Sequence, residues 1–168
     1  MALDLACYLT LENGGKIDGA TTKTNRKGSF DGFELFHEVI SPRDLATGQA
    51  TGKRTHKPFC ISGYYGPWVP QCWDALARNE SFKEVKIECF SPNNLTKMGG
   101  VGQELLHYRV TLKEAFLSRM SHNMPFNRDQ NLSKIEHTIR LEFVYGSITW
   151  EWLAGTTKMY EDRWTVTK

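Results

Sequence analysis

The sequence contains no long apolar run, no closely spaced cysteine pair and no large excess of either charge. Without about 20 consecutive apolar residues, it offers no candidate transmembrane helix. Only four cysteines occur, and the absence of a CxxC pair excludes the usual zinc and redox motifs. We therefore expect free thiols in a protein made in the cytoplasm. The four are Cys7, Cys60, Cys72 and Cys89.

The charge balance excludes two classes of partner. Lysine and arginine number 21 against 19 aspartate and glutamate, a formal net charge of +2. This balance does not indicate a dedicated nucleic-acid binder or a protein that docks on anionic membranes. The segment Met1–Thr10 carries Asp4 and has neither a basic start nor a small-residue cleavage site. We expect no secretory signal peptide.

The length favours one domain over residues 1–168. A chain of this size buries roughly 70% of its extended surface, so it needs no disulfide or metal for stability. Hydrophobic residues at 40% and charged residues at 24% are ordinary for a globular protein. The 12% aromatic content, with five tryptophans, favours a β-rich core or broad apolar contact surfaces.

Apolar and polar residues alternate with period two through most of the chain, which predicts half-buried strands. Gly146 separates the last two alternating runs, and we predict that these pair as neighbouring antiparallel strands joined by a tight turn. Another run, Phe33–Ile40, has apolar residues on both parities and is predicted to be covered on both faces. The alternating runs are Leu3–Leu11, Val85–Cys89, Leu106–Leu112, Ile139–Tyr145 and Ile148–Trp152.

One interruption of this pattern has helical spacing. Pro67 and Pro70 precede or open it, and Asn79 is its predicted end. We predict about three turns of helix that pack an apolar stripe on the sheet. Truncation of the tryptophan in this stripe is expected to cost about 3–5 kcal/mol. The stripe consists of Val69, Cys72, Trp73 and Leu76.

These elements together predict a mainly β fold, a small antiparallel β-barrel of two packed sheets with one short α-helix. Three stretches have no assigned structure and are predicted to be extended loops: Gly14–Ser29, Ser41–Gly52 and Ser118–Lys134. Loops of this length in a compact domain are usually functional or ordered by a partner.

The segment Gly48–Thr55 superficially resembles a phosphate-binding loop. Gly48–Thr55 has only three residues between its glycines, and Arg54 follows Lys53 where a P-loop needs a hydroxyl. No nucleotide site is expected. The basic cluster Lys53, Arg54, His56 and Lys57 could bind nucleic-acid phosphates. Phe59 is the one nearby aromatic residue for base stacking, which does not favour this function. A solvated strand start or a polar subunit contact explains the cluster more simply.

Catalytic and metal-binding patterns are also missing. The five histidines are scattered along the chain, and none pairs with another ligand at helical or turn spacing. Cys72 and Cys89 continue apolar faces and are predicted core residues. There is no GxSxG nucleophile motif. We expect no enzyme, metal or cofactor. The histidines are His37, His56, His107, His122 and His137.

The segment Gly48–Ser62, GQATGKRTHKPFCIS, resembles the TGK.THKP signature of Hcp, the haemolysin-coregulated tube protein family of bacterial type VI secretion. Tyr64–Phe82 resembles the family's short helix, and Glu84–Ser91 and Ile135–Trp150 resemble its strands, with Asp162–Trp164 as the tail. The resemblance covers essentially the whole chain. The matching motif residues are Thr51, Gly52, Lys53, Thr55, His56, Lys57 and Pro58.

The resemblance implies a β-barrel with one helix that assembles as a hexameric ring. Rings of this family stack into a tube that a contracting sheath expels, with a spike protein at the tip and effector proteins in the lumen. The protein would then be secreted without a signal peptide. Ser41–Gly52 would reach toward the next ring, and Phe33–Ile40 would meet the core on one face and a neighbour on the other. The predicted stacking residues are Ser41, Asp44, Thr47, Gly48 and Gln49.

Three alternatives remain at this point. A phage-type tail tube protein would share the fold and assembly, although the THKP segment favours the secretion system. A small β-barrel hydrolase or toxin would need a converging nucleophile and base. A nucleic-acid binder would show salt-sensitive retention on a DNA or RNA column.

Overall fold

The structure is a computed structural model that describes residues 4–92, 104–126, 128–129, 134 and 136–163. Leu3, Ile135 and Trp164, each at the end of a segment named above, lie outside these residues. The described chain is mainly β with one α-helix and one 3₁₀ helix. Its elements are β1 (Asp4–Leu11), β2 (Gly15–Ile17), a 3₁₀ helix (Thr24–Arg26), β3 (Phe30–Phe36), β4 (Val39–Ile40), β5 (Thr55–His56), β6 (Phe59–Tyr64), α1 (Trp68–Ala77), β7 (Phe82–Pro92), β8 (Glu104–Asn123), β9 (Thr138–Val144), β10 (Ser147–Trp152) and β11 (Lys158–Arg163).

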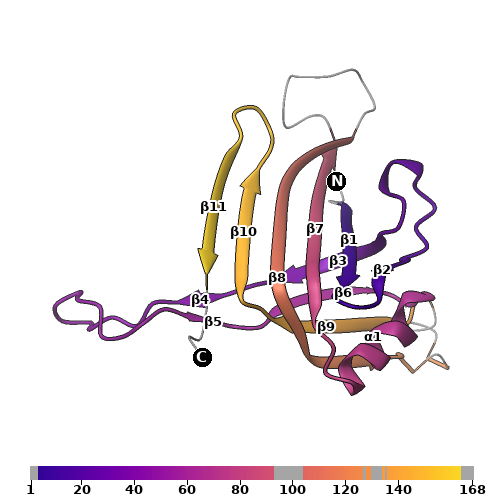
Figure 1. Cartoon of the computed structure of the whole chain (residues 1–168), viewed down its shortest axis with the longest axis horizontal. Helices are drawn as coiled ribbons and strands as arrows, with labels where there is room; N and C mark the ends of the chain where they lie inside the picture. The colour runs from indigo at the N-terminus through magenta and orange to yellow at the C-terminus, as the bar shows by residue number, and fades with distance from the viewer. Residues whose placement is uncertain (1–3, 93–103, 127, 130–133, 135, 164–168) are drawn as a thin grey trace.

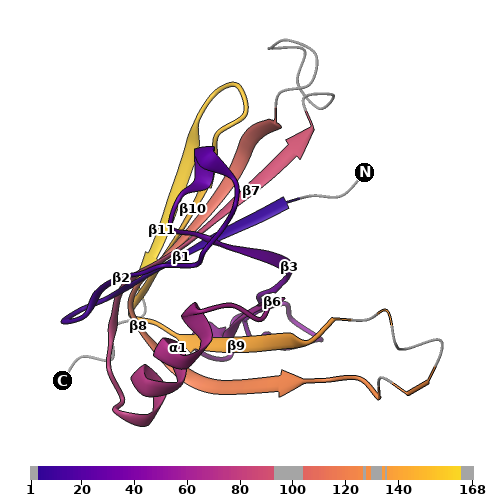
Figure 2. The same cartoon turned by 90° about the vertical axis from the view of Figure 1, so that its right-hand side faces the viewer.

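The main sheet closes on itself as an antiparallel barrel. Its strands run in the order β11-β10-β8-β7-β1-β3-β6-β9, and β9 also pairs with β8. β2 pairs with β1, while β4 and β5 form a separate two-stranded sheet. Figures 1 and 2 show two layers, one containing β11, β10, β8, β7 and β1, and the other containing β3, β6, β9 and the second half of β8. The predicted barrel with one short helix is confirmed.

The long strand β8 turns the corner between the two layers. Its first half pairs with β10 and its second half with β9, and Glu114 between them has a φ of 51°. The backbone N–H of Gly146 donates to the carbonyls of Lys113 and Glu114, both at 3.1 Å. A Cβ on Gly146 would lie 3.0 Å from the Cβ of Glu114, so the corner favours glycine.

The predicted hairpin between the last two alternating runs is therefore wrong. β9 pairs with β6 and β8, whereas β10 pairs with β8 and β11. The physical reason is that Gly146 moves the chain from one half of β8 to the other instead of folding β10 back on β9.

The run Phe33–Ile40 divides into β3 and β4. The register of β3 against β6 shifts between Gly32 and Glu34, which is a bulge at Phe33. Phe33 is 44% exposed, whereas Leu35 packs against the core. The two residues share a parity in the sequence, and the bulge places them in different environments. Burial of this run on both faces within the chain is not observed, because Phe36, Val39 and Ile40 are also exposed.

The helix forms where the spacing predicts it, but its buried face is rotated. Val69 and Cys72 are buried as expected, and Leu76 packs partly against the core. Trp73 is 37% exposed, so its prediction as a core residue is wrong. Trp68, at the first turn of α1, takes that place and stacks on Phe30 with ring centroids 4.0 Å apart. The helix ends as predicted, since Asn79 has a φ of 53°.

Apolar side chains from the barrel strands and α1 fill the interior. They form one continuous core that includes residues of both layers. Trp68 is 1% exposed, and Phe82 and Phe143 meet edge to face with centroids 5.4 Å apart. The helix packs against β8 (Figure 2). The largest fully buried apolar side chains are Trp68, Phe59, Phe82, Phe143, Leu9, Ile61, Ile87, Leu112, Ile139, Leu141 and Ile148.

The predicted loops contain more structure than their sequences suggested. Gly14–Ser29 includes β2 and the 3₁₀ helix, and Ser41–Gly52 contains a bridge between Arg43 and Ala50. Strand β8 continues into the third stretch as far as Asn123. The loop prediction is wrong for these parts, because cross-strand backbone pairing orders them without an alternating pattern.

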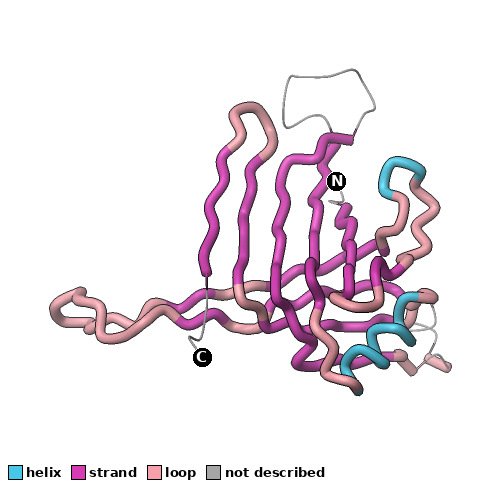
Figure 3. The backbone as a smooth tube through the Cα atoms, in the orientation of Figure 1, coloured by secondary structure: helices cyan, strands magenta, loops and turns pink. Residues whose placement is uncertain are grey.

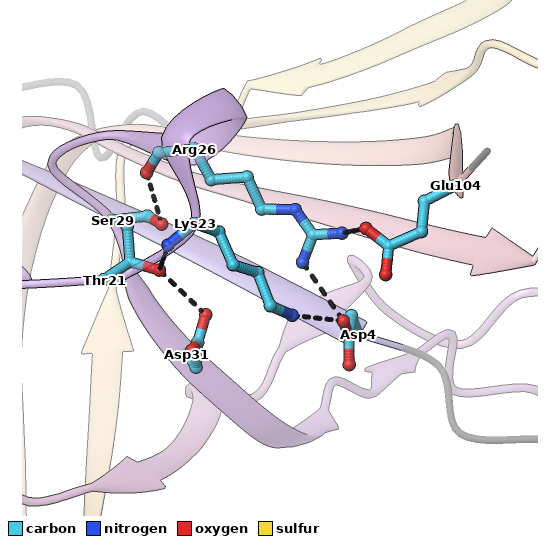
Figure 4. Close-up of polar contacts among 7 residues, drawn as sticks. All are labelled: Asp4, Thr21, Lys23, Arg26, Ser29, Asp31 and Glu104. Atoms are coloured by element: carbon cyan, nitrogen blue, oxygen red, sulfur yellow. Dashed lines mark hydrogen bonds and ion pairs between the residues drawn. The ribbon is translucent and has the colours of Figure 1, made fainter. Parts of the chain in front are cut away.

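A polar cluster fixes the first of these loops to the barrel (Figure 4). The fully buried Arg26 pairs with Glu104 and with Asp4, and its guanidinium carbon lies 3.6 Å from the centre of the Phe90 ring. Lys23 also pairs with Asp4. Arg26 therefore joins the 3₁₀ helix to the starts of β1 and β8.

Candidate functional site

A two-stranded arm, residues 39–56, projects from the barrel (Figure 1). β4 and β5 pair at its base, and the Arg43–Ala50 bridge continues the pairing outward. Beyond the strands, the backbone is loop to the tip (Figure 3). Leu45 at the tip is fully exposed. The arm carries every predicted stacking residue, all exposed: Ser41, Asp44, Thr47, Gly48 and Gln49.

Hydrogen bonds within the tip hold its shape. The Asp44 carboxylate accepts from the backbone N–H of Ala46 at 2.9 Å and from the N–H and hydroxyl of Thr47 at 2.7 and 3.0 Å. The hydrogen bond from the Thr47 N–H is the main reason that the pKa of Asp44 lies below its usual range. The backbone of Asp44 also pairs with Gly48 and Gln49, both at 2.9 Å. The tip is therefore ordered before any partner binds.

The predicted motif residues lie on the returning strand of the arm and just after it. The backbone N–H of Thr51 donates to the Pro42 carbonyl at 3.0 Å, and that of Lys57 donates to Glu38 at 3.0 Å. The side chain of His56 is buried, at 4% exposed. Pro58 is half-buried. The other motif residues, Thr51, Gly52, Lys53, Thr55 and Lys57, are exposed. His56 is therefore the one motif residue whose side chain is buried in the protein.

His56 lies at the centre of a polar network, which we call the arm-base network: His37, Arg54, His56, Tyr145 and Asp162. His56 Nε2 lies 2.9 Å from Asp162 Oδ2, and His56 Nδ1 lies 2.8 Å from the Tyr145 hydroxyl. The same hydroxyl lies 2.7 Å from His37 Nε2. Arg54 pairs with both oxygens of Asp162. The network joins the arm to β11 and to the segment between β9 and β10.

The hydrogen positions follow from the chemistry of these groups. The Asp162 carboxylate only accepts, so His56 Nε2 carries hydrogen. With a neutral His56 ring, Nδ1 accepts from the Tyr145 hydroxyl, and His37 Nε2 then donates to the Tyr145 oxygen. Each of these three contacts then joins one donor to one acceptor.

The surroundings shift the pKa values of three of these groups in directions that favour this arrangement. The hydrogen bond from Arg54 is the largest cause that lowers the pKa of Asp162, which is only 7% exposed. Burial raises the pKa of Tyr145. Burial, followed by the electrostatic interaction with His56, lowers the pKa of His37. These directions favour an ionised Asp162, a protonated Tyr145 hydroxyl and a neutral His37.

Sequence reasoning missed the network, because its members are far apart in the chain. The sequence showed five histidines without local partners, and Tyr145 and Asp162 only as parts of a strand run and of the tail. The partners of His56 are 89 and 106 residues away. The one local signal was the motif itself, whose histidine stands among exposed residues.

The described residues offer little for nucleophilic or metal chemistry. All four cysteines are free and buried, and burial raises the pKa of Cys72 to about 12 and of Cys89 to about 11. Such thiols stay protonated and unreactive at neutral pH. No group of three or more metal-ligating side chains occurs in these parts of the chain. None of their helices is long and apolar enough to cross a membrane.

Known proteins share this architecture. The structure is similar to the Hcp1 protein from the E. coli EAEC 042 pathovar, with a TM-score of 0.80 and 22% identity, over 98% of this chain and 100% of that one. It is also similar to the secreted protein Hcp3 from Pseudomonas aeruginosa, with a TM-score of 0.72 and 22% identity, over 96% and 99% of the two chains. Identities this low establish the shared fold alone.

Sequence comparison establishes the family. The chain is 30% identical over 114 residues to the "Major exported protein" of Pseudomonas aeruginosa strain PAO1. The matched stretch is 68% of this chain and 63% of the length of that relative. The family described as "Type VI secretion system effector, Hcp" matches residues 8–152. The chain therefore belongs to the Hcp family of type VI secretion.

Proposed function

We propose that this protein is a structural subunit of the type VI secretion tube. Six copies close into a ring, and rings stack into a tube that leaves the cell. The observation that carries the proposal is the arm, which is ordered at its tip by Asp44 and fixed at its base by buried His56. A projecting element that needs no partner for its shape is suited to contact another subunit.

A closed ring of this kind needs two different complementary surfaces on each subunit. Two groups of exposed apolar side chains are the candidates for these surfaces. The β3–β4 patch and the β10–β11 patch lie on different strands and expose between 39% and 67% of each side chain. Exposed apolar patches of this kind mark interaction sites. The first consists of Phe33, Phe36, Val39 and Ile40, and the second of Trp152, Met159 and Tyr160.

The mechanism is mechanical rather than chemical. Modest contacts, repeated around a ring and between rings, combine through avidity, so the tube can form, be expelled and dissociate. We propose that the five stacking residues of the arm, Ser41, Asp44, Thr47, Gly48 and Gln49, contact the next ring. We also propose that the tube works with a sheath, a spike protein at its tip and effectors in its lumen. Family membership supports these partners and does not favour the phage-tube, hydrolase or nucleic-acid alternatives.

Electron microscopy of the purified protein, with light scattering to measure its mass, tests the proposal. We expect six-fold rings with a mass of six times 19.2 kDa. A monodisperse monomer at high concentration would retain the barrel and contradict the proposed function.

A further inference from the structure

A small pocket is lined by three segments of the chain, which lie in Figure 1 on the side of the molecule that carries α1, away from the arm. It has a volume of about 170 Å³ and lies between the loop 19–22, the start of β3 and the segment that joins β6 to α1. The stacked rings of Phe30 and Trp68, both buried, line it together with Tyr64 and Tyr65. Asp31 completes the lining.

The charged group in the lining of this pocket is negative. Asp31 is the single ionisable acid or base of its lining, apart from the two tyrosine hydroxyls. Its carboxylate accepts from the Thr21 hydroxyl at 3.4 Å, which is a long hydrogen bond (Figure 4). The nearby ammonium of Lys23 pairs with Asp4 instead. Aromatic faces and a carboxylate are the groups that attract a positive charge.

The loop wall of the pocket is firmly held. Gly19 and Thr21 donate backbone hydrogen bonds to Gly28 and Ser29, at 3.3 and 3.1 Å. The backbone N–H of Ala20 donates to the Asp18 carboxylate at 3.0 Å. A Cβ on Gly19 would lie 2.1 Å from the Ser29 backbone, so the loop cannot accept even alanine there without moving. The pocket is therefore formed before a ligand arrives.

We propose that this pocket binds an organic cation of the guanidinium or alkylammonium type. The tyrosine rings and Asp31 supply the attraction. The volume of about 170 Å³ suits one such group, because pockets for larger ligands run to about 300–1,000 Å³. The cation is either a basic side chain of a second copy or a free small molecule. The first source rests on the proposed function, and the exposed Arg43 and Lys53 of the arm, with Lys57 just after it, supply candidates.

Methyl NMR of the intact protein tests the binding. Ala20, Thr21 and Thr22 carry methyl groups at the pocket wall. N-methylguanidinium and tetramethylammonium chloride should shift these signals saturably, and neutral N-methylurea should not. Asp31→Asn should weaken binding of the cations about fivefold, whereas Asp74→Asn, on an exposed face of α1, should leave it unchanged. Tyr64→Leu should also weaken binding. Equal shifts with N-methylurea, or full affinity in Asp31→Asn, would overturn the proposal.

The source of the cation is decided by measuring assembly of the same variants. If Asp31→Asn and Lys53→Gln each weaken assembly in light scattering, the cation is a side chain of a second copy. Binding of the probes with unchanged assembly of Asp31→Asn indicates a free small molecule. The absence of any assembly in the unmodified protein contradicts the proposed function but leaves the NMR result on the pocket intact.

Discussion

The barrel interior and the centre of the arm-base network, His56, Tyr145 and Asp162, are both buried, but they are stabilised in different ways. The interior consists of apolar side chains from both layers, each in contact with several others. In the arm-base network, Tyr145 joins two histidines, and Asp162 joins His56 to Arg54. Truncation of an apolar core side chain lowers the free energy of unfolding in proportion to the volume removed. Removal of one member of a polar network leaves a buried group without its hydrogen bond, and this weakens the other contacts of the network as well. Variants of the two regions should therefore differ in what they disturb.

The largest effect is expected from Trp68→Ala. Its ring is buried and stacked on Phe30, so its removal should lower the free energy of unfolding by about 3–5 kcal/mol, measured by urea denaturation. Trp73→Ala is the matched control, because the same change on a side chain that is 37% exposed should cost clearly less than Trp68→Ala. Equal losses in the two variants would show that the buried face of α1 is wrongly assigned.

The next effect is expected from Asp162→Asn. This change removes the charge that holds Arg54 and leaves buried His56 with a weaker acceptor, so unfolding should become easier by about 1–3 kcal/mol. The half-exposed Arg54 is screened by water, which keeps the loss below that of a fully buried ion pair. Hydrogen exchange at the backbone N–H of Lys57, at the arm base, should also become faster.

Asp74→Asn is the control for this change. Asp74 pairs with Arg78 on the exposed face of α1, and its loss should leave exchange in the arm unchanged. Slower or unchanged exchange at Lys57 in Asp162→Asn would contradict the role given to the network.

Acid should weaken the arm base in two steps. The pKa of His37 is lower in the folded protein than its ordinary value of 6.5. The stability that the neutral His37 contributes is therefore complete above pH 6.5 and is lost as the pH falls through the folded pKa. The pKa of Asp162 is also lowered, so its contribution is lost only below the ordinary value of 3.8. Hydrogen exchange in the arm, corrected for the intrinsic rate, should rise first below pH 6.5. His37→Gln should remove that first step. If the pH dependence of exchange in this variant matched that of the unmodified protein, His37 would not be the group that causes the step.

The smallest effect on unfolding is expected from Asp44→Ala. Its carboxylate is fully exposed and bonds only within the tip, so the urea midpoint should not change. Stacking of rings, measured by sedimentation, should weaken while single rings persist, and deletion within Thr47–Ala50 should do the same. Collapse of the rings themselves would show that the tip has a different role.

The sequence predicted the barrel well because alternation reports burial along one strand at a time. It could not show which strands pair, and the hairpin expected at Gly146 failed because β8 turns a corner at Glu114. The helical stripe was ambiguous for a related reason. Val69 and Cys72 are common to the two possible faces, and only the packing against Phe30 selects Trp68 over Trp73.

The candidate site was predictable only in part. The predicted motif and loop residues lie on the arm or directly after it. The network behind His56 needs contacts with Tyr145 and Asp162 that no local spacing encodes. The pocket near Asp31 combines three segments and has no sequence signature. Local patterns thus report elements, whereas polar sites depend on the tertiary fold.

The most direct test of the central claim, that the arm contacts another subunit, is photo-crosslinking from its tip. Leu45→Cys places a fully exposed thiol there, and the four native cysteines are buried, so a maleimide–diazirine reagent should label this position alone. In assembled protein, we predict crosslinks between chains, identified by mass spectrometry of mixed isotope-labelled subunits. Crosslinks only within one chain, in a sample that forms rings and stacks, would contradict the claim.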